Sequence, residues 1–251
     1  MNNYEKQALV WDWDAFDDMP EYKYWLGYAS RFGKNVLLPM CAHGKAGAYL
    51  AENGLYVTAF DITPNMIAEG KKRFGHIPGL QLITADILDL SLPRADFDFA
   101  YIAGNGDLHL LSSIADVESA FLQLHRHLRP GGCLALELTM PFVDSWSSPR
   151  QIFHPRVPGY TDKKIYKANE SSYDTAKQRH CIRQEVFVED TSGTKSFVQE
   201  ICLQYYTRDV ITETLVKCGF DISGEWSSRQ NEPWKPGDPT LIIEALKLIP
   251  A

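Results

Sequence analysis

The sequence predicts an open, doubly wound α/β sheet that is mostly parallel, with an antiparallel β insert in its C-terminal half. Three observations support this fold class. Short apolar runs alternate with segments of helical period from about residue 36 to 139. Two of these runs end at acids, Asp61 and Asp86. After Met140 the alternation stops, and two long strand-like segments follow.

The first βαβ unit is the most informative part of the chain. We expect a strand over residues 36–38, a tight turn holding Gly44, a helix over 46–53 and a second strand over 55–60 that closes at Asp61. A carboxylate in that place can accept hydrogen bonds from both hydroxyls of a ribose, and its distance from the turn is close to the roughly 20 residues expected. The unit therefore predicts a nucleoside site.

The alternation continues through three further strands and their helices. The segment 97–103 is apolar apart from Asp98, which is typical of a strand covered on both faces. Ligands of such sheets bind at the carboxyl ends of the strands, where Asp86 also lies. The elements expected here are a helix over 63–74, strands over 80–84 and 97–103, a helix capped near Asp116 and ended by Arg129-Pro130-Gly131-Gly132, and a strand over 133–139.

Residues 141–175 show no strong period. Two long strands are expected over 180–189 and 195–206, joined by a hairpin turn at 190–193. On the second strand, Ile201, Leu203 and Tyr205 share one face, which we expect to pack, whereas Glu200, Gln204 and Tyr206 share the other, which we expect to be available. A helix over 208–217 and strands over 220–226 and 241–246 complete the pattern.

We therefore expect three segments. Residues 1–140 would hold N-terminal lid helices and the cofactor-binding core, 141–206 an antiparallel insert on the substrate side, and 207–251 the final helix and strand pair.

Composition narrows the class of protein. The 251 residues carry a formal charge of −7, which disfavours nucleic acid as a partner. No uncharged apolar stretch is long enough for a signal core or a membrane helix, so we expect a cytoplasmic protein without a membrane partner. The five cysteines are scattered and never spaced as CxxC, which favours reduced, buried thiols over disulfides. An oligomer is possible, but nothing in the sequence indicates one.

Four segments together resemble the class I S-adenosylmethionine-dependent methyltransferases: VLLPMCAHGK, VTAFDITPNMI, TADILDL and HRHLRPGGCLALEL. The resemblance covers roughly residues 20–140 and resumes in YTRDVITETLVKCGF and the closing strand pair. It implies a Rossmann-like, seven-stranded sheet whose last strand is antiparallel. It also implies S-adenosylmethionine as cofactor and S-adenosylhomocysteine as product. The insert resembles those of small-molecule methyltransferases, particularly N-methyltransferases of amino acids or sugars.

The resemblance also assigns cofactor-binding roles. Asp61 would hold the ribose, with a helix cap before Thr63-Pro64 as the alternative. Asp86 would accept from the adenine amino group while the N–H of Ile87 meets a ring nitrogen; a solvated turn residue is the alternative. The complete set is Met40, Cys41, Ala42, Gly44, Asp61, Ile62, Asp86, Ile87, Ala103 and Gly104.

The first motif departs from the family pattern. Leu38 stands where the family has an acid, and Met40 and Ala42 stand at its first two turn glycines, so that only Gly44 remains. We expect Met40 to alter the pocket for the methionyl part of the cofactor. S-adenosylmethionine has no pyrophosphate, which makes its demands on this turn milder than those of a dinucleotide.

Catalytic and substrate-binding residues are less strongly indicated. His109 could accept a proton from the acceptor, but a histidine followed by two leucines is also typical of a packed residue. Gly104, Asn105 and Asp107 follow the fourth strand, where the family places the transferring methyl, yet they are also good turn residues. The substrate-binding candidates are Tyr22, Trp25, Asn105, Arg183 and Gln204.

Tyr22, Trp25 and Ala29 recur at helical spacing, which indicates a packing stripe or a lid that closes over the cofactor. No metal site is expected. His125 and His127 face different directions on a helix, and His43 beside Cys41 offers too few ligands.

The sequence thus predicts methyl transfer from S-adenosylmethionine to a small-molecule N- or O-nucleophile by in-line displacement. An amine that arrives deprotonated needs no catalytic base, whereas an oxygen nucleophile would need help from His109 or a tyrosine. The alternative is a non-catalytic nucleoside-binding protein with a degenerate first motif. A dinucleotide dehydrogenase is a distant third reading because GxGxxG is absent.

Overall fold

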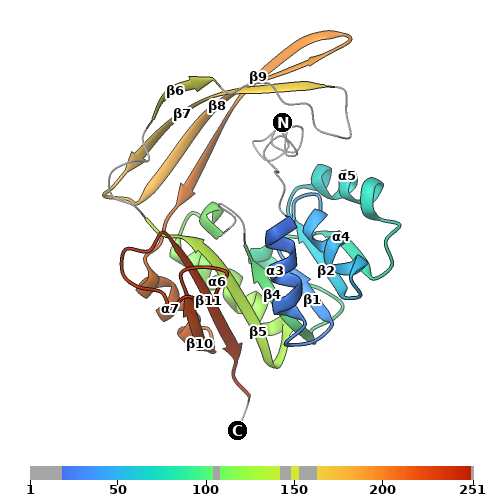
Figure 1. Ribbon diagram of the computed structural model, residues 1–251, viewed down its shortest axis with the longest axis vertical. Helices are drawn as coiled ribbons and strands as arrows, with labels where there is room; N and C mark the ends of the chain where they lie inside the picture. The colour runs from blue at the N-terminus through green and yellow to red at the C-terminus, as the bar shows by residue number, and fades with distance from the viewer. Residues whose placement is uncertain (1–18, 104–107, 142–147, 153–162, 250–251) are drawn as a thin grey trace. The chain divides into compact units, whose positions relative to one another are not determined.

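The computed structural model describes residues 19–103, 108–141, 148–152 and 163–249 (Figure 1). The chain forms two compact units. The core unit comprises Met19–Met140 and Tyr206–Ala251, and the insert unit contains Pro141–Tyr205.

The core unit is built on a seven-stranded sheet of order β10-β11-β5-β4-β1-β2-β3. Strands β1 to β5 are parallel, and β11 runs antiparallel to both β5 and β10. The predicted fold class, a mostly parallel doubly wound sheet with a separate antiparallel insert, is confirmed. The strands are β1 (Asn35–Leu38), β2 (Tyr56–Asp61), β3 (Leu80–Thr84), β4 (Phe97–Ile102), β5 (Leu128–Thr139), β10 (Phe220–Trp226) and β11 (Thr240–Lys247).

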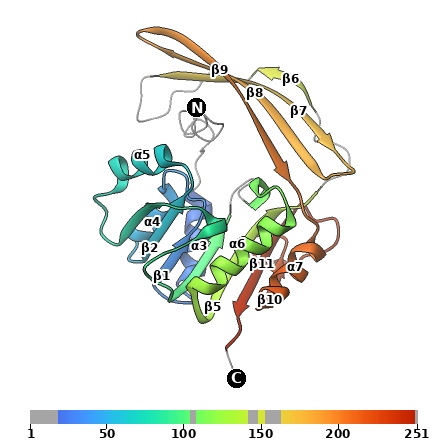
Figure 2. The ribbon, with the colours of Figure 1, turned by 180° about the vertical axis from the view of Figure 1, so that it is seen from behind.

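Helices cover both faces of this sheet (Figures 1 and 2). Helices α3 (Met19–Ala29), α4 (Lys45–Glu52) and α5 (Pro64–Phe74) contribute residues to one buried cluster. Helices α6 (Ile114–His127) and α7 (Arg208–Lys217) contribute to the other. Side chains of β5 alternate between the two clusters, as the period of two along a strand requires. We call these the α3-side and α6-side clusters.

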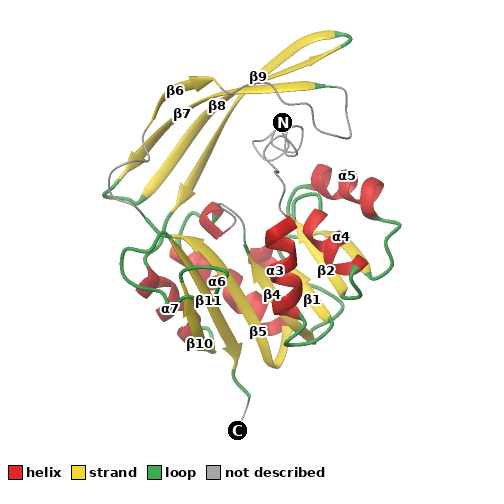
Figure 3. Cartoon of the chain, viewed as in Figure 1, coloured by secondary structure: helices red, strands yellow, loops and turns green. Residues whose placement is uncertain are grey.

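Most predicted elements agree with the structure within one or two residues at each end, but two boundaries were wrong (Figure 3). Helix α6 starts at Ile114, because Ser113 and not Asp116 is its N-cap: the Ser113 hydroxyl accepts from the Asp116 N–H at 3.1 Å. Arg129-Pro130-Gly131-Gly132 lies within β5, where the pairing with β4 shifts in register, and so it does not form a helix-ending turn.

Asp98, a charged residue in the otherwise apolar strand β4, accepts hydrogen bonds from residues near the amino ends of β1 and β5. Its Oδ2 accepts from the Asn35 N–H at 2.9 Å, and its Oδ1 accepts from Arg129 Nε at 2.7 Å. Arg129 also donates to the Phe32 carbonyl at 2.9 Å. Partial burial raises the pKa of Asp98, but the hydrogen bonds from Arg129 and Asn35 outweigh it and hold that pKa below its ordinary value.

The insert unit is a four-stranded antiparallel sheet of order β6-β7-β8-β9. Its strands are β6 (Ser148–Ile152), β7 (Lys164–Asp174), β8 (Arg179–Asp190) and β9 (Gly193–Gln204). The predicted hairpin is confirmed as β8 and β9. The aperiodic interpretation of residues 141–175 was wrong, since β7 is a long strand in continuous register with β8. The sequence of this strand, KIYKANESSYD, is mostly polar and lacks the apolar run that predicts a strand.

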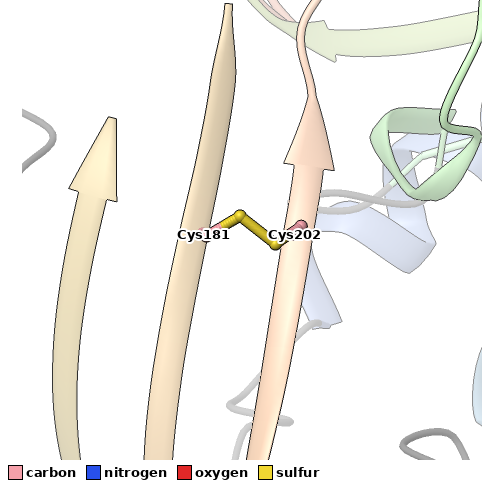
Figure 4. Close-up of a disulfide and its surroundings, with 2 residues drawn as sticks. All are labelled: Cys181 and Cys202. Carbon is pink, nitrogen blue, oxygen red and sulfur yellow. A yellow bond between two sulfur atoms is a disulfide. The ribbon is translucent and has the colours of Figure 1, made fainter. Parts of the chain in front are cut away.

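The expectation of five reduced cysteines was also wrong. Cys181 and Cys202 form a disulfide between β8 and β9 (Figure 4). The two residues lie directly opposite each other in the β8–β9 register, which brings their Cα atoms to 4.0 Å. Sequence spacing could not reveal this pair, because it depends on the register of the hairpin. Cys41, Cys133 and Cys218 are free thiols.

The assignment of faces on the second hairpin strand needs one correction. Strand β9 ends at Gln204, so Tyr205 and Tyr206 lie beyond it, and both are buried. Tyr206 belongs to the core unit, where its hydroxyl donates to the Leu111 carbonyl at 2.8 Å. It is therefore a packed residue and does not share an available face with Glu200.

None of the helices within the described ranges combines the length and the hydropathy needed to cross a lipid bilayer.

Candidate functional site

The turn after β1 has an unusual backbone. Met40, Ala42 and Gly44 all lie in the left-handed region, with φ of 53°, 50° and 79°. This conformation is costly for residues that carry a Cβ, and glycine adopts it readily. The turn therefore places a positive φ at every second residue from Met40 to Gly44, although two of these three residues are not glycine.

Hydrogen bonds to strand β2 hold this turn in place. The Cys41 N–H donates to the Phe60 carbonyl at 3.0 Å, and the Ala42 N–H donates to Asp61 Oδ2 at 2.9 Å. Gly44 is favoured by its φ of 79°, and a Cβ there would come within 2.4 Å of Leu82 Cδ2, so the Leu82 side chain would have to shift. The carboxyl ends of β1 and β2 thus form one connected unit.

Asp61 stands at the centre of this unit. Its Oδ1 accepts from the Thr63 N–H at 2.9 Å, while Oδ2 accepts from Ala42. Desolvation raises the pKa of Asp61 against these hydrogen bonds. An ionised carboxylate offers about four acceptor positions, so the bonds from the two backbone N–H groups and from the Thr63 side chain leave capacity for a further hydroxyl donor. The N-cap of α5 is Thr63, and the exposed Ile62 lies between it and Asp61.

Asp86 follows β3 and begins a short 3-10 helix, η1 (Ile87–Asp89). Its Oδ1 accepts from the Leu88 N–H at 2.9 Å, and Ile87 is buried. Asp86 is thus the N-cap of η1, which agrees with its alternative as a turn residue, whereas the N-cap of α5 is Thr63 and not Asp61. A capping role and ligand binding are compatible, because each carboxylate keeps acceptor capacity.

The other predicted site residues do not all lie at the carboxyl ends of the core strands. Ala103 is partly buried at the end of β4, whereas Gly104, Asn105 and Asp107 fall outside the described residues. His109 lies in η2 (Leu108–Leu110) and is 2% exposed. This burial among the leucines of the α6-side cluster favours the packing interpretation of His109 over the catalytic one.

Helix α3 buries the predicted aromatic stripe. Trp25 is fully buried and stacks on Tyr101, with ring centroids 4.7 Å apart, and Tyr22 lies 5.8 Å from Tyr49. Packing therefore accounts for both side chains in this structure.

Arg183 and Gln204 belong to the insert unit. Arg183 pairs with Glu185 at 2.9 Å, and Gln204 Nε2 donates to the Lys177 carbonyl at 2.7 Å. Their substrate-binding role stays a prediction.

Potential metal ligands are engaged in other contacts. Within the described ranges, one group has metal-ligand character, formed by Cys181, Glu200 and Cys202, and its two sulfurs are bonded to each other. His127 Nδ1 lies 2.7 Å from the Gln123 carbonyl, and His43 Nδ1 lies 3.3 Å from Arg73 Nη1.

A polar cluster near the carboxyl end of β5 was not among the predicted site residues. Glu137 on β5 pairs with Arg229 from the β10–β11 connection at 2.9 Å, and Tyr24 of α3 lines the same pocket. The sequence feature that could have indicated this cluster is Glu137, an acid inside the apolar run CLALEL. Its arginine partner is distant in sequence and has no local signature.

Comparisons with known proteins agree with this geometry. Residues 36–132 match the family model described as a methyltransferase domain. An uncharacterised methyltransferase of Mycobacterium tuberculosis is 35% identical over 96 residues, which cover 38% of this chain and 46% of that protein. The chain thus matches about half the length of such curated relatives.

Solved structures extend the likeness to the whole fold. An S-adenosylmethionine-dependent methyltransferase from Clostridium acetobutylicum superposes with a TM-score of 0.79 at 18% identity, covering 98% of this chain and 99% of the other. The sugar N-methyltransferase KedS8 from Streptoalloteichus gives 0.72 at 18% identity, covering 92% and 86%. These matches show that the chain has the fold of the S-adenosylmethionine-dependent methyltransferases, and that residues 36–132 are similar to a methyltransferase domain.

Proposed function

We propose that the protein transfers a methyl group from S-adenosylmethionine to a small-molecule acceptor. One observation carries this proposal above the others. Asp61 is held at the end of β2 by the same left-handed turn that follows β1. This arrangement supports a nucleoside site even though the sequence of the turn is atypical.

The residues present fit the donor. Asp61 keeps acceptor capacity for a ribose hydroxyl, and Asp86 with Ile87 follows β3, the strand next to β2. Met40 packs against the α6-side cluster, which supports a cradle whose backbone path is kept despite the missing glycines. The absence of an acid at Leu38 leaves the amino group of the donor without the carboxylate that the family pattern supplies.

When bound, the donor supplies a methyl group that is already electrophilic. The protein then has to position the acceptor and exclude water. Because His109 is buried among leucines, its role as a base is the weaker part of the prediction. We therefore propose a nitrogen acceptor that arrives deprotonated, and KedS8, a sugar N-methyltransferase, is a structural neighbour consistent with this choice. A cytoplasmic location remains part of the proposal.

A non-catalytic nucleoside-binding protein is the second candidate. Leu38, Met40 and Ala42, which replace the acid and glycines of the first motif, are the observation that favours it. It predicts binding of the donor without turnover on any acceptor.

Calorimetric titration with S-adenosylmethionine and S-adenosylhomocysteine tests the proposal. We expect the intact protein to bind both, and Asp61→Ala to weaken binding by about 10- to 100-fold, since hydrogen bonds to a charged group contribute about 1.5–3 kcal/mol. Asp61→Asn keeps the side-chain volume and controls for collapse of the turn. Asp221→Ala removes an exposed acid of β10 and should change nothing. An intact protein that binds neither compound would contradict the proposal.

A further inference from the structure

The Cys181–Cys202 disulfide lies on the more exposed face of the insert sheet. Side chains of a strand share a face at every second residue, so Arg179 and Arg183 flank Cys181 on β8, and Glu200 lies beside Cys202 on β9. These three charged residues are exposed, and both cysteines are partly exposed. The buried apolar cluster of the insert lies on the opposite face. Dissolved molecules can therefore reach the disulfide.

The positions of the two strands decide which sulfur a small thiol can attack. Thiol–disulfide exchange is a displacement at sulfur, in which the attacking thiolate approaches in line with the bond that breaks. This bond runs between β8 and β9, and β9 is the last strand in the sheet order, with no described strand on its outer side (Figure 4). The in-line approach to Cys202 thus starts from an open sheet edge. The same approach to Cys181 passes over β7, where Ser172 lies opposite it.

Charged neighbours add a preference for the kind of thiol. The Glu200 carboxylate lies within 4.8 Å of both sulfurs, so it repels an anionic thiolate that approaches Cys202 and disfavours a thiol with a positive group much less. Glu170 and Asp174, which lie diagonal to Cys181 on β7, offset the two arginines of β8. Local charge therefore does not make Cys181 clearly the better leaving group, and access to the open edge selects Cys202 as the sulfur that is attacked.

We propose that the Cys181–Cys202 pair is a reversible exchange site for low-molecular-weight aminothiols, which attack Cys202 from the open edge of β9. The thiolate forms a bond to Cys202 Sγ while the bond to Cys181 Sγ breaks, and the electron pair leaves with Cys181 Sγ. A second thiolate then attacks the small-molecule sulfur of this mixed disulfide and releases Cys202 Sγ. Each thiol gives one proton to water, and each cysteine takes one up. Two thiols become one small disulfide, and the protein disulfide becomes two thiols.

This exchange goes beyond methyl transfer and does not depend on it. Reduction removes the cross-link between β8 and β9, in a unit whose apolar cluster has two buried members, Ile165 and Val186. The hairpin should then open locally more often, because little apolar burial holds it closed. The exchange thereby couples the redox state of a small thiol to the local stability of the insert.

Alkylation after an acid quench, read by intact mass spectrometry, measures the exchange. The folded protein is incubated with millimolar cysteamine, whose thiolate form is neutral overall, or with millimolar glutathione, whose thiolate form is anionic. After the quench the protein is unfolded and alkylated, so the oxidised form carries three labels and the reduced form five. We expect both thiols to reduce the folded protein, with cysteamine at least about 3-fold faster at equal thiolate concentration. Adding cystamine should restore three labels.

Two further measurements test the attacked sulfur and the charge preference. Peptide mapping of early samples should find the mixed disulfide on Cys202 at least about 5-fold more often than on Cys181, because access favours that sulfur. Glu200→Gln should speed reduction by glutathione about 3- to 10-fold and change reduction by cysteamine little. Asp221→Asn, which neutralises an exposed acid of β10 in the core unit, should change neither rate.

Several results would overturn this assignment. A folded protein that keeps three labels in both thiols, and gains two more only after unfolding, has a purely structural disulfide. Mixed disulfides found mainly on Cys181 would contradict attack from the open edge of β9. Equal acceleration of both thiols by Glu200→Gln would mean that the variant loosens the sheet, since a charge effect acts on the anionic thiol alone. Five labels in protein that has met no thiol would show that the pair does not form.

Discussion

The core unit and the insert unit are stabilised by different interactions. The core sheet separates two large apolar clusters, whereas the largest cluster described within the insert has two fully buried apolar residues, Ile165 and Val186. The insert buries polar side chains instead: Lys167 is fully buried, and Gln199 donates to Gln184 at 2.6 Å. Apolar burial stabilises the first unit, while strand pairing, polar contacts and a disulfide stabilise the second.

The largest expected effect on stability comes from truncating a large, fully buried side chain of the core unit. Phe99 is fully buried on β4 and contacts the rings of Tyr28 and Phe32 at centroid distances of 5.7 and 5.8 Å. Phe99→Ala should lower the free energy of unfolding by about 3–5 kcal/mol. Phe197→Ala, at a half-buried insert position, should cost clearly less. Urea unfolding of both variants checks the contrast, and equal losses would contradict it.

Removing the disulfide should affect the insert selectively. Replacing Cys181 and Cys202 together with serine should destabilise the hairpin by about 3 kcal/mol, the loop-closure value for a loop of roughly 20 residues. Hydrogen exchange should accelerate at β8 and β9 and remain unchanged at β4 and β5. A reducing agent should reproduce this pattern in the wild type. Uniform acceleration across both units would show that they unfold together.

The Asp98 clamp should give the core a defined acid sensitivity. Because the folded pKa of Asp98 lies below the unfolded value of about 3.9, its stabilisation is complete above that value and is lost as pH falls through the folded pKa. Asp98→Asn should therefore cost about 1–3 kcal/mol at pH 7, and its deficit relative to wild type should shrink below about pH 4. Chemical unfolding at several pH values measures this. A deficit that does not change with pH would contradict the assignment.

The smallest expected effect is a gain in the free energy of unfolding, where the preceding variants should show a loss. Ala42→Gly removes a strained left-handed alanine, so we expect a gain of up to about 1 kcal/mol, the strain relief being partly offset by greater freedom of the unfolded chain. The control is Ala48→Gly inside helix α4, which should lose about 1 kcal/mol. Thermal melts of the two variants should move in opposite directions. A loss in both would mean that the turn is not strained.

The two units also differ in how well their strands can be predicted from the sequence, and the cause is the same difference in apolar burial. Strands β2 and β4 could be recognised from short apolar runs, because burial on both faces leaves a local hydrophobic signal. Strand β7 leaves no such signal, since its side chains are mostly polar.

The predicted site divides in a similar way. Asp61 and Asp86 follow strands and could be assigned from sequence, although their backbone hydrogen bonds could not. Tyr24, Glu137 and Arg229 come from three distant segments, and only folding brings them to one pocket.

The sequence by itself determined the order of the core strands along the chain, the position of the acids after β2 and β3, and the family resemblance. These features depend on local hydrophobic period and on residues close in sequence. Tertiary structure decided the left-handed path of Met40 and Ala42, the pairing of Cys181 with Cys202, and the clamp formed by Asp98 and Arg129. Each of these depends on which distant backbone lies alongside, because register and hydrogen-bond partners are set only when the sheets assemble.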